Sequence, residues 1–419
     1  MPMVRRESVG DDKVEICDRK WDILSTARSI ASARSLEGRD EAFLLVSIDA
    51  LVDRLALWRR HLPMVEPHFA VKVNPDEVVI RCLAALGVGF DCASREEIET
   101  VLRVGVAPER IIYAHPCKMS SYIKFANDRQ VNLMTFDNAE ELAKIVDFHT
   151  SPELILRIAV SDPTAQSPLG RKFGAEPVEK APELLRIAAE MGLSIRGISF
   201  HVGSGCNDSL VYRRAIEHAR RLFDIGMTLG HRMDILDIGG GFPGTENPNA
   251  PFEKIASIIR CSLDDFFPDP SVRVIAEPGR FFATRPFTLV TSVMAATAVS
   301  ADNITKKDED SSSTGYMYYL NDGVYGTFNC ILIDAAKPVG QPLFEGPGPC
   351  FPSTLWGPTC DSIDLIEDNK KMRRLIVGEW LIYRDMGAYS AAVATGFNGF
   401  QKPNRIYVMK QRTWAMLGM

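Results

Sequence analysis

The chain has 419 residues, 46% of them hydrophobic and 24% charged, so it is long enough for two domains with ordinary cores. No apolar run approaches the roughly 18 residues that a membrane-spanning helix needs, and a net charge of −6 provides no basic surface for nucleic acid. The nine cysteines form no CxxC pair and the charged N-terminal stretch has no apolar block, which predicts a cytoplasmic protein without disulfides, a metal site or a secretory signal.

Short apolar runs rich in β-branched residues recur along the first two thirds of the chain. They predict strands at about 68–72, 87–91, 110–114, 131–136, 153–159, 195–201, 233–238 and 272–277. The intervening stretches, such as "PDEVVIRCLAAL" and "NAEELAKIVDFH", place apolar residues at helical spacing. Alternating strands and helices without a GxGxxG after the first strand favour an α/β fold with a closed (β/α)8 TIM-like barrel, expected at residues 42–286.

The pattern changes after residue 286. Runs such as "TLVTSVMAATAVS", "RRLIVGEWLIYRD" and "RIYVMKQRT" resemble strands separated by turns, and no comparable helical tract accompanies them. Residues 287–419 are therefore expected to form a second, β-rich domain of sandwich-like or barrel-like form. We expect residues 1–41 to join this domain and the polar segment 301–315 to be a mobile loop within it.

The predicted barrel strands end in polar or glycine-rich residues. Their ends read Lys72, Asp91, His115, Asp137, Arg157, His201, "GGG" and "EPGR". Any one of them has an ordinary structural explanation, since a lone histidine or arginine at a strand end is more often structural than catalytic. Functional groups of such barrels gather at the C-terminal ends of the strands, so eight together predict a site there.

Two neighbouring strand ends predict a phosphate site. The segment "DIGGGFPG" lets backbone N–H groups, including those of Gly240 and Gly241, approach an anion closely. The next segment, "AEPGR", adds Gly279 and the forked guanidinium of Arg280. A tight turn would explain the glycines alone, but barrels of this class commonly hold phosphate at these two loops.

Lys72 follows the apolar run "FAV", where burial would make its amine easier to deprotonate and able to attack an aldehyde. Glu277 could accept a hydrogen bond from a pyridine nitrogen and make the ring a strong electron sink. A phosphate site, an amine and a carboxylate at one barrel mouth predict pyridoxal 5'-phosphate, with Lys72 forming the Schiff base. His201 is expected to lie on the ring face and Ser204 near the phosphate.

These residues stand in the motifs "FAVKVN", "GFDCAS", "HVGSG", "DIGGGFPG", "AEPGR", "YYLNDGVYGTFNCILID", "WGPTCDSID" and "DMGAYS". With them, from about residue 40 to residue 410, the chain resembles the eukaryotic ornithine decarboxylases of the alanine-racemase-like barrel family. The resemblance implies Lys72 as the Schiff-base lysine and the following residues around the cofactor: Asp91, Arg157, His201, Ser204, Gly240, Gly241, Glu277, Gly279, Arg280 and Tyr389.

The resemblance also assigns roles to the second domain. It implies that Cys360 protonates Cα in the active site of the partner subunit, so the enzyme would be a homodimer with shared active sites. Asp334 and Asp361 would bind the distal ammonium of ornithine, and the same end of the pocket would be lined by Tyr325, Ile333 and Phe397. The implied reaction converts L-ornithine to putrescine and CO2, the first step of polyamine biosynthesis.

Two alternatives stay open at this point. A decarboxylase of lysine and ornithine, or of another basic amino acid, is one, because a single methylene changes pocket affinity by only about 1 to 3 kcal/mol. The other is an inactive regulator like the antizyme inhibitor, which the retained site residues disfavour. Residues 118–142 occupy the surface expected to bind antizyme, but their basic residues fit a solvated helix face equally well.

Overall fold

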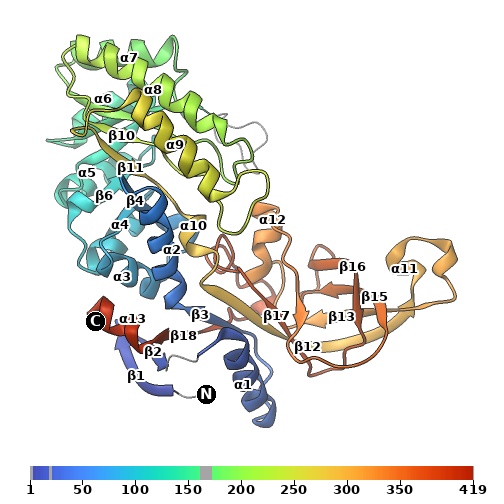
Figure 1. The fold of residues 1–419 in the computed structure, drawn as a ribbon. Coiled ribbons are helices and arrows are strands. Elements are labelled where there is room, and N and C mark those ends of the chain that lie inside the picture. The colour runs from blue at the N-terminus through green and yellow to red at the C-terminus, as the bar shows by residue number, and fades with distance from the viewer. Residues whose placement is uncertain (1–2, 18–20, 161–171, 419) are drawn as a thin grey trace. The chain divides into compact units, whose positions relative to one another are not determined.

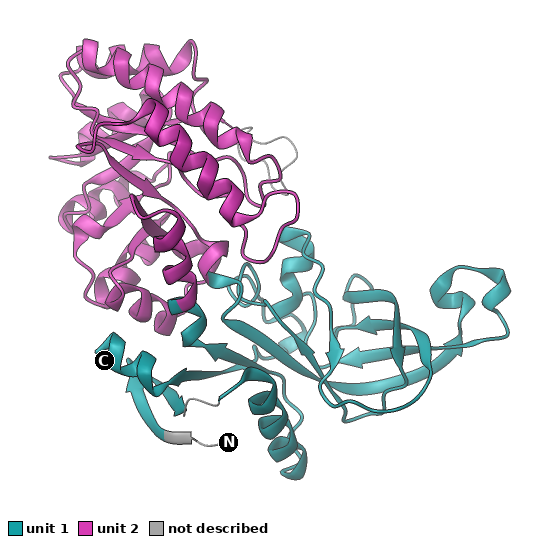
Figure 2. Cartoon of the chain, viewed as in Figure 1, with its two compact units in different colours: residues 1–52, 283–419 teal, residues 53–282 magenta. Residues whose placement is uncertain are grey.

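The computed structural model describes residues 3–17, 21–160 and 172–418. The chain divides into two compact units, shown in different colours in Figure 2. Unit 1 combines residues 1–52 with residues 283–419, and unit 2 comprises residues 53–282. Within the described part of the chain, every helix is too short or too polar to cross a membrane.

Unit 2 contains a closed barrel of eight parallel strands, which confirms the predicted fold class (Figure 1). In chain order the strands are β4 (Val65–Ala70), β5 (Gly89–Cys92), β6 (Ile111–Tyr113), β7 (Leu133–Phe136), β8 (Glu153–Ile158), β9 (Ile195–Phe200), β10 (Ile235–Asp237) and β11 (Arg273–Ala276). Each pairs with the next, and β11 closes the barrel by pairing with β4. Each lies within about three residues of a predicted strand.

Helices follow the strands in the same alternation. They are α2 (Ile48–His61), α3 (Glu77–Ala85), α4 (Arg95–Arg103), α5 (Ser120–Asp128), α6 (Ala139–Phe148), α7 (Lys180–Glu190), α8 (Leu210–Thr228), α9 (Phe252–Phe266) and the short α10 (Arg280–Ala283). Side chains that accept a backbone N–H of the first turn cap α3, α4 and α6, namely Asp76, Ser94 and Asn138. Apolar side chains from β6, β7, β8, β10 and β11 pack together in one core cluster: Ile112, Leu133, Ile155, Ile235 and Ile275.

The ends of β10 and β11 are held together by an arginine of α2. Arg54 is buried, and its guanidinium donates to the carbonyl oxygens of Phe281 and Pro243 at 2.8 and 3.0 Å. It also lies over the ring of Phe281, 3.6 Å from the centroid. Because Pro243 belongs to the glycine segment and Phe281 follows "EPGR", this one side chain fixes the two loops that were expected to bind phosphate.

Unit 1 is built on a ten-stranded sheet. Its main path runs β1 (Met3–Val9), β2 (Asp12–Cys17), β18 (Asn404–Lys410), β3 (Phe43–Ser47), β12 (Phe287–Ser300), β13 (Thr314–Leu320), β15 (Cys350–Trp356) and β16 (Leu365–Arg373). The strand β17 (Trp380–Tyr383) pairs with β12 and with the short β14 (Gln341–Pro342). The helix α1 (Ile23–Leu36) buries Ala27 and Ala31 against a core that includes Phe43, Val290 and Trp380.

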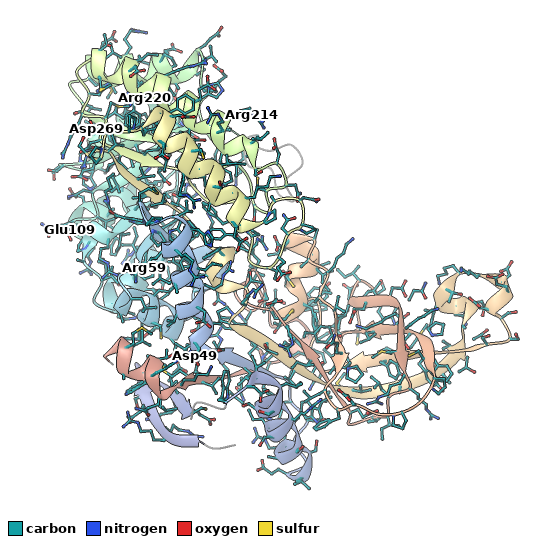
Figure 3. All side chains as sticks on the ribbon, viewed as in Figure 1. Asp49, Arg59, Glu109, Arg214, Arg220 and Asp269 are labelled. Carbon is teal, nitrogen blue, oxygen red and sulfur yellow. The ribbon has the colours of Figure 1, made fainter. Side chains whose placement is uncertain are left out.

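Both ends of the chain meet in this sheet, because β18 lies between β2 and β3 and is parallel to both. Asp49, labelled in Figure 3 at the start of α2, reinforces the arrangement. Its carboxylate accepts the backbone N–H of Lys410 at 3.0 Å and the hydroxyl group of Thr413 in the C-terminal helix α13 (Gln411–Leu417). The start of α2 is therefore tied to the end of the chain.

The segment 301–315, expected to be a loop, has regular structure. It contains α11 (Asp302–Thr305) and the one-turn 3-10 helix η3 (Asp308–Asp310), and it leads into β13. The hydroxyl group of Thr305 donates to Asp310 at 2.7 Å, and Ile304 is buried. The polar composition of this segment therefore did not indicate its two short helices, which one buried apolar side chain anchors.

Candidate functional site

Lys72 lies directly after β4, in the one-turn 3-10 helix η1 (Val71–Val73). The turn buries Val71 and Val73 and leaves the Lys72 side chain 43% exposed, so the prediction that this amine is buried was wrong. Its Nζ lies 3.8 Å from Oδ2 of Asp91, the third residue of β5. The two side chains therefore form an ion pair at the C-terminal ends of adjacent strands.

Asp91 is buried, and neither carboxylate oxygen makes a hydrogen bond of ordinary geometry to the described residues. Burial, together with the nearby charge of Glu277, raises the pKa of Asp91 to about 7, while Lys72 and Arg157 act in the opposite direction. Glu277 is also buried, and burial and the neighbouring Asp237 raise its pKa well above the usual range. The barrel mouth thus gathers buried carboxyl groups and two cations that partly balance them.

His201 follows β9, and its Nδ1 accepts the backbone N–H of Gly203 at 3.0 Å. Its proton is therefore on Nε2 when the ring is neutral. Burial and the positive charges of Lys72 and Arg157 hold the pKa of His201 well below its usual range, so the ring is neutral at pH 7. A Cβ at Gly240 would lie 2.6 Å from Nε2 of this ring, which places the ring against the glycine segment.

The two glycine-rich segments that were expected to bind phosphate lie in unit 2. Gly241 has a φ of +106°, and a Cβ there would lie 2.6 Å from Val202 Cγ2 and 2.7 Å from the hydroxyl group of Tyr212. At Gly279 a Cβ would overlap Cγ2 of Val73. Arg280 donates to the hydroxyl group of Ser204 at 2.7 Å, which joins the loop after β11 to the loop after β9. Because of these close neighbours, only glycine fits at positions 241 and 279.

A second cluster of predicted residues lies in unit 1. The hydroxyl group of Tyr325 donates to Oδ2 of Asp361 at 2.5 Å, and its ring lies 4.4 Å from that of Phe397. The hydrogen bond from Tyr325 lowers the pKa of Asp361, which is a carboxylate at neutral pH. Tyr325 and Phe397 also line a small pocket together with Asp322 and Lys402.

The loop that carries Cys360 is exposed but well anchored. The backbone N–H of Cys360 donates to Oδ1 of Asn398 at 3.1 Å. Asp364, which is buried, accepts the backbone N–H of Val324 at 2.7 Å and that of Thr359 at 2.9 Å. These bonds hold the segment before Tyr325 against the segment before Cys360, so the thiol and the Tyr325–Asp361 pair share one support.

Three further predicted residues lie in unit 1. Asp334 is buried at the end of the short helix α12 (Cys330–Asp334), and Ile333 before it is 51% exposed. Tyr389 has a φ of +51° in the turns after β17. Cys360, Asp361, Tyr325 and Phe397 belong to this unit as well, whereas the other predicted residues belong to unit 2.

The expected antizyme surface, residues 118–142, is not a uniformly solvated face. Lys118 is fully buried, and its Nζ lies 2.9 Å from Oε1 of Glu141 and 2.7 Å from the carbonyl oxygen of Thr135. Lys124 is 64% exposed and pairs with Asp128 at 3.1 Å. One of the basic residues is therefore internal to the barrel unit and another is on its surface.

Several functional-site neighbours were missed in the sequence. Asp237 precedes the glycine segment and is completely buried beside Glu277. Glu97 accepts the backbone N–H of Ala93 at 2.6 Å, and burial is the main cause that raises its pKa to about 7. An aspartate at the end of an apolar strand was the available signal for Asp237. No local pattern indicates that Asp364 or Asn398 supports the Cys360 loop.

The residues present fit pyridoxal phosphate. The glycine segment and the Arg280–Ser204 pair form a close-packed cradle for a phosphate. Asp91 has unused hydrogen-bonding capacity beside the Lys72 amine, as a site for a cationic imine requires. Glu277 provides a carboxyl group at the same barrel mouth, and the neutral His201 ring lies against the glycines.

Comparisons with known proteins agree with this chemistry. Residues 48–284 match the family model described as pyridoxal-dependent decarboxylase, pyridoxal binding domain. The chain is 57% identical over 412 residues to an ornithine decarboxylase from Caenorhabditis elegans, covering 98% of this chain and 97% of the relative. It is 45% identical to antizyme inhibitor 2 from Xenopus laevis, with 90% and 82% covered. The solved Paramecium bursaria Chlorella virus arginine decarboxylase is 35% identical, with a TM-score of 0.85 and coverage of 92% and 100%.

Proposed function

This chain belongs to the family of pyridoxal-dependent decarboxylases, and from that premise we propose that it converts ornithine to putrescine and CO2, the first step of polyamine biosynthesis. Pyridoxal phosphate is its cofactor. The observation that best supports this proposal is the position of Lys72. Its Nζ lies 3.8 Å from Asp91, at the same barrel mouth as Glu277 and the glycine cradle. The identity of 57% to an ornithine decarboxylase over nearly the full length supports ornithine as the substrate. A cytoplasmic location is part of the proposal.

When bound, pyridoxal phosphate supplies an electron sink for the negative charge left at Cα after CO2 departs. Lys72 holds the cofactor aldehyde, and Asp91 stabilises positive charge on the lysine nitrogen. Arg280, Ser204 and the N–H groups of the glycine cradle bind the phosphate. The neutral His201 ring would lie beside the bound cofactor without adding positive charge.

The residues of unit 1 act on the substrate. Asp361 and Asp334 bind the distal ammonium of ornithine, and Tyr325 orients Asp361 through its hydroxyl group. Ile333 and Phe397 form the apolar wall around the substrate stem. Cys360 donates the proton that Cα receives after CO2 has left, and its exposed position on an anchored loop supports this role.

The functional unit is a homodimer in which each active site combines Lys72 of one chain with Cys360 of the other. The exposure of the Cys360 loop supports this arrangement, because a thiol that serves another chain must reach beyond its own surface. In a two-fold dimer the same exchange occurs at both sites. A monomer should therefore lack activity even when it is folded.

The substrate assignment is tested with purified protein, pyridoxal phosphate and carboxyl-labelled ornithine, lysine and arginine in parallel. Release of labelled CO2 should be fastest from ornithine. Lysine, one methylene longer, should react more slowly, since one methylene changes pocket affinity by about 1 to 3 kcal/mol. Equal or faster release of CO2 from lysine or arginine would contradict the assignment of ornithine as the preferred substrate.

A non-catalytic regulator is the second candidate, favoured by the 45% identity to antizyme inhibitor 2. The two are separated by absorbance, because a cofactor attached to Lys72 absorbs visible light. The Lys72–Asp91 pair and the Arg280–Ser204 pair support the enzyme, since a regulator has no need to retain both. Failure of the wild-type chain to bind pyridoxal phosphate would favour the regulator.

A further inference from the structure

The aspartate that ends β10 lies beside the carboxyl group of Glu277. Asp237 pairs in register with Ile275 of β11, and Glu277 follows that strand directly. The Oδ1 atom of Asp237 accepts the backbone N–H of Gly239 at 2.9 Å. The backbone N–H of Glu277 donates to the carbonyl oxygen of Gly239 at 2.7 Å. Gly239 therefore ties the two acidic residues to one turn at the barrel mouth.

Both acidic residues are buried, and each side chain affects the pKa of the other. Asp237 is completely buried and Glu277 is 8% exposed. Oδ2 of Asp237 has no hydrogen bond of ordinary geometry to the described residues, and the Glu277 carboxyl group lies near enough to affect the pKa of Asp237. Two neighbouring buried carboxyl groups cannot both ionise at low cost, so such pairs retain one proton between them.

The surrounding charges set the balance of this pair. Lys72 and Arg157 favour ionisation of Glu277, and the buried Asp91 opposes ionisation of Asp237. His201 also faces the glycine segment, but its ring is neutral. Burial raises the pKa of Asp237 to about 7 and that of Glu277 well above the usual range. Burial and mutual repulsion therefore favour a state in which the two carboxyl groups retain a proton between them.

We propose that Asp237 is a positioning residue for Glu277, sharing one proton with it and fixing the orientation in which Glu277 presents an oxygen to the cofactor's ring nitrogen. This inference rests on the proposed function. When one Glu277 oxygen accepts the N–H of the ring, the shared proton is on Asp237, and its O–H donates to the other Glu277 oxygen. No proton is gained or lost by the pair in this rearrangement.

The test measures cofactor affinity rather than activity. The full chain, stripped of cofactor, is titrated with pyridoxal phosphate and with its analogue in which C–H replaces the ring nitrogen, at several pH values. Wild-type protein should prefer pyridoxal phosphate. In Asp237→Leu this preference should fall by about tenfold, the size expected for losing a hydrogen bond to a charged group, while affinity for the analogue changes by less than about twofold.

The Asp237→Asn variant separates orientation from titration. Its amide can still donate to Glu277, so the preference for the ring nitrogen should survive. Removing the acidic neighbour should shift the pH midpoint of that preference to lower pH, because Glu277 then ionises more easily. Ser199→Ala is the matched control, since Ser199 is buried on β9 and pairs in register with Asp237. It should change neither ligand preference nor its pH midpoint.

Equal weakening of both ligands by Asp237→Leu would overturn the inference and leave Asp237 a purely structural residue. If that variant does not fold, the Asn variant decides, and an unchanged pH midpoint would overturn the inference. A wild-type chain that binds neither ligand would instead contradict the proposed function. The two failures are therefore distinguishable.

Discussion

The hydroxyl group of Tyr325 donates a hydrogen bond to Oδ2 of Asp361 over 2.5 Å, and this bond lowers the pKa of the carboxylate. Tyr325→Phe removes the donor while keeping the ring that packs on Phe397. Asp361 should then be less well oriented toward the substrate ammonium, so KM for ornithine should rise by about fivefold with little change in kcat. Steady-state kinetics on the purified variant measures both values.

Tyr316→Phe provides the control for that experiment, because Tyr316 lies in the same unit on β13 and stacks on Tyr318. It should leave KM unchanged. A Tyr325→Phe enzyme that loses kcat at constant KM would show that the hydroxyl group serves the reaction step and not substrate binding.

Lys72→Ala should abolish the covalent attachment of the cofactor. The visible absorbance of the loaded wild-type protein should disappear, and activity should fall by at least about a thousandfold, as for loss of other covalent catalysts. Borohydride treatment followed by peptide mass analysis should leave the cofactor on Lys72 in the wild type. Lys180→Ala, at an exposed lysine of the same unit, should behave as wild type. Labelling of any other lysine would contradict the assignment.

Mixing Lys72→Ala chains with Cys360→Ala chains tests the shared active sites. Each heterodimer then has one site with both residues intact and one with neither. Random exchange makes half of the dimers mixed, so about a quarter of wild-type activity should return. Activity is assayed after mixing under conditions that allow subunit exchange. An absence of recovery, with exchange shown by mass analysis, would place Lys72 and Cys360 of the same chain in each site.

The barrel unit should lose stability in mild acid through His68. This residue is 2% exposed, and burial, followed by the charge of Arg273, lowers its pKa to about 4. An unfolded histidine titrates near 6.5, so between about pH 6.5 and pH 4 only the unfolded state takes up the proton. Its contribution to stability is complete above about pH 6.5 and declines toward pH 4, by up to about 1.4 kcal/mol per pH unit.

The measurement for His68 is the free energy of unfolding in urea at several pH values, for wild type and His68→Asn. The variant should show a smaller decrease between neutral and acidic pH, whatever its absolute stability. Parallel curves for the two proteins would contradict a neutral, buried imidazole.

The barrel was predictable because its strands are buried on both faces and its helices on one, which leaves two distinct periods in the sequence. The strand ends followed from the same pattern, so Lys72, Asp91 and Glu277 could be assigned to one mouth. The exposure of Lys72 could not be predicted, because it depends on a 3-10 turn that buries Val71 and Val73 and leaves Lys72 between them exposed.

Contacts between residues far apart in the chain also could not be predicted from the sequence. Asp364 holds Val324, forty residues earlier, and Asn398 holds Cys360. Asp237 looked like an ordinary residue before a glycine turn, and its role became visible only beside Glu277. The helix at the start of segment 301–315 was missed because one buried isoleucine among charged residues gives no periodic signal.

The position of β18 between β2 and β3 has a consequence for synthesis on the ribosome. The strands β2 and β3 are translated before the barrel, and neither can pair with β18 until residues 404–410 have been synthesised. Until then their edges are unpaired, whereas all strands of the barrel have already emerged. A nascent chain stalled after the barrel would therefore expose the unpaired edges of β2 and β3. Chaperones should then bind mainly to its first fifty residues.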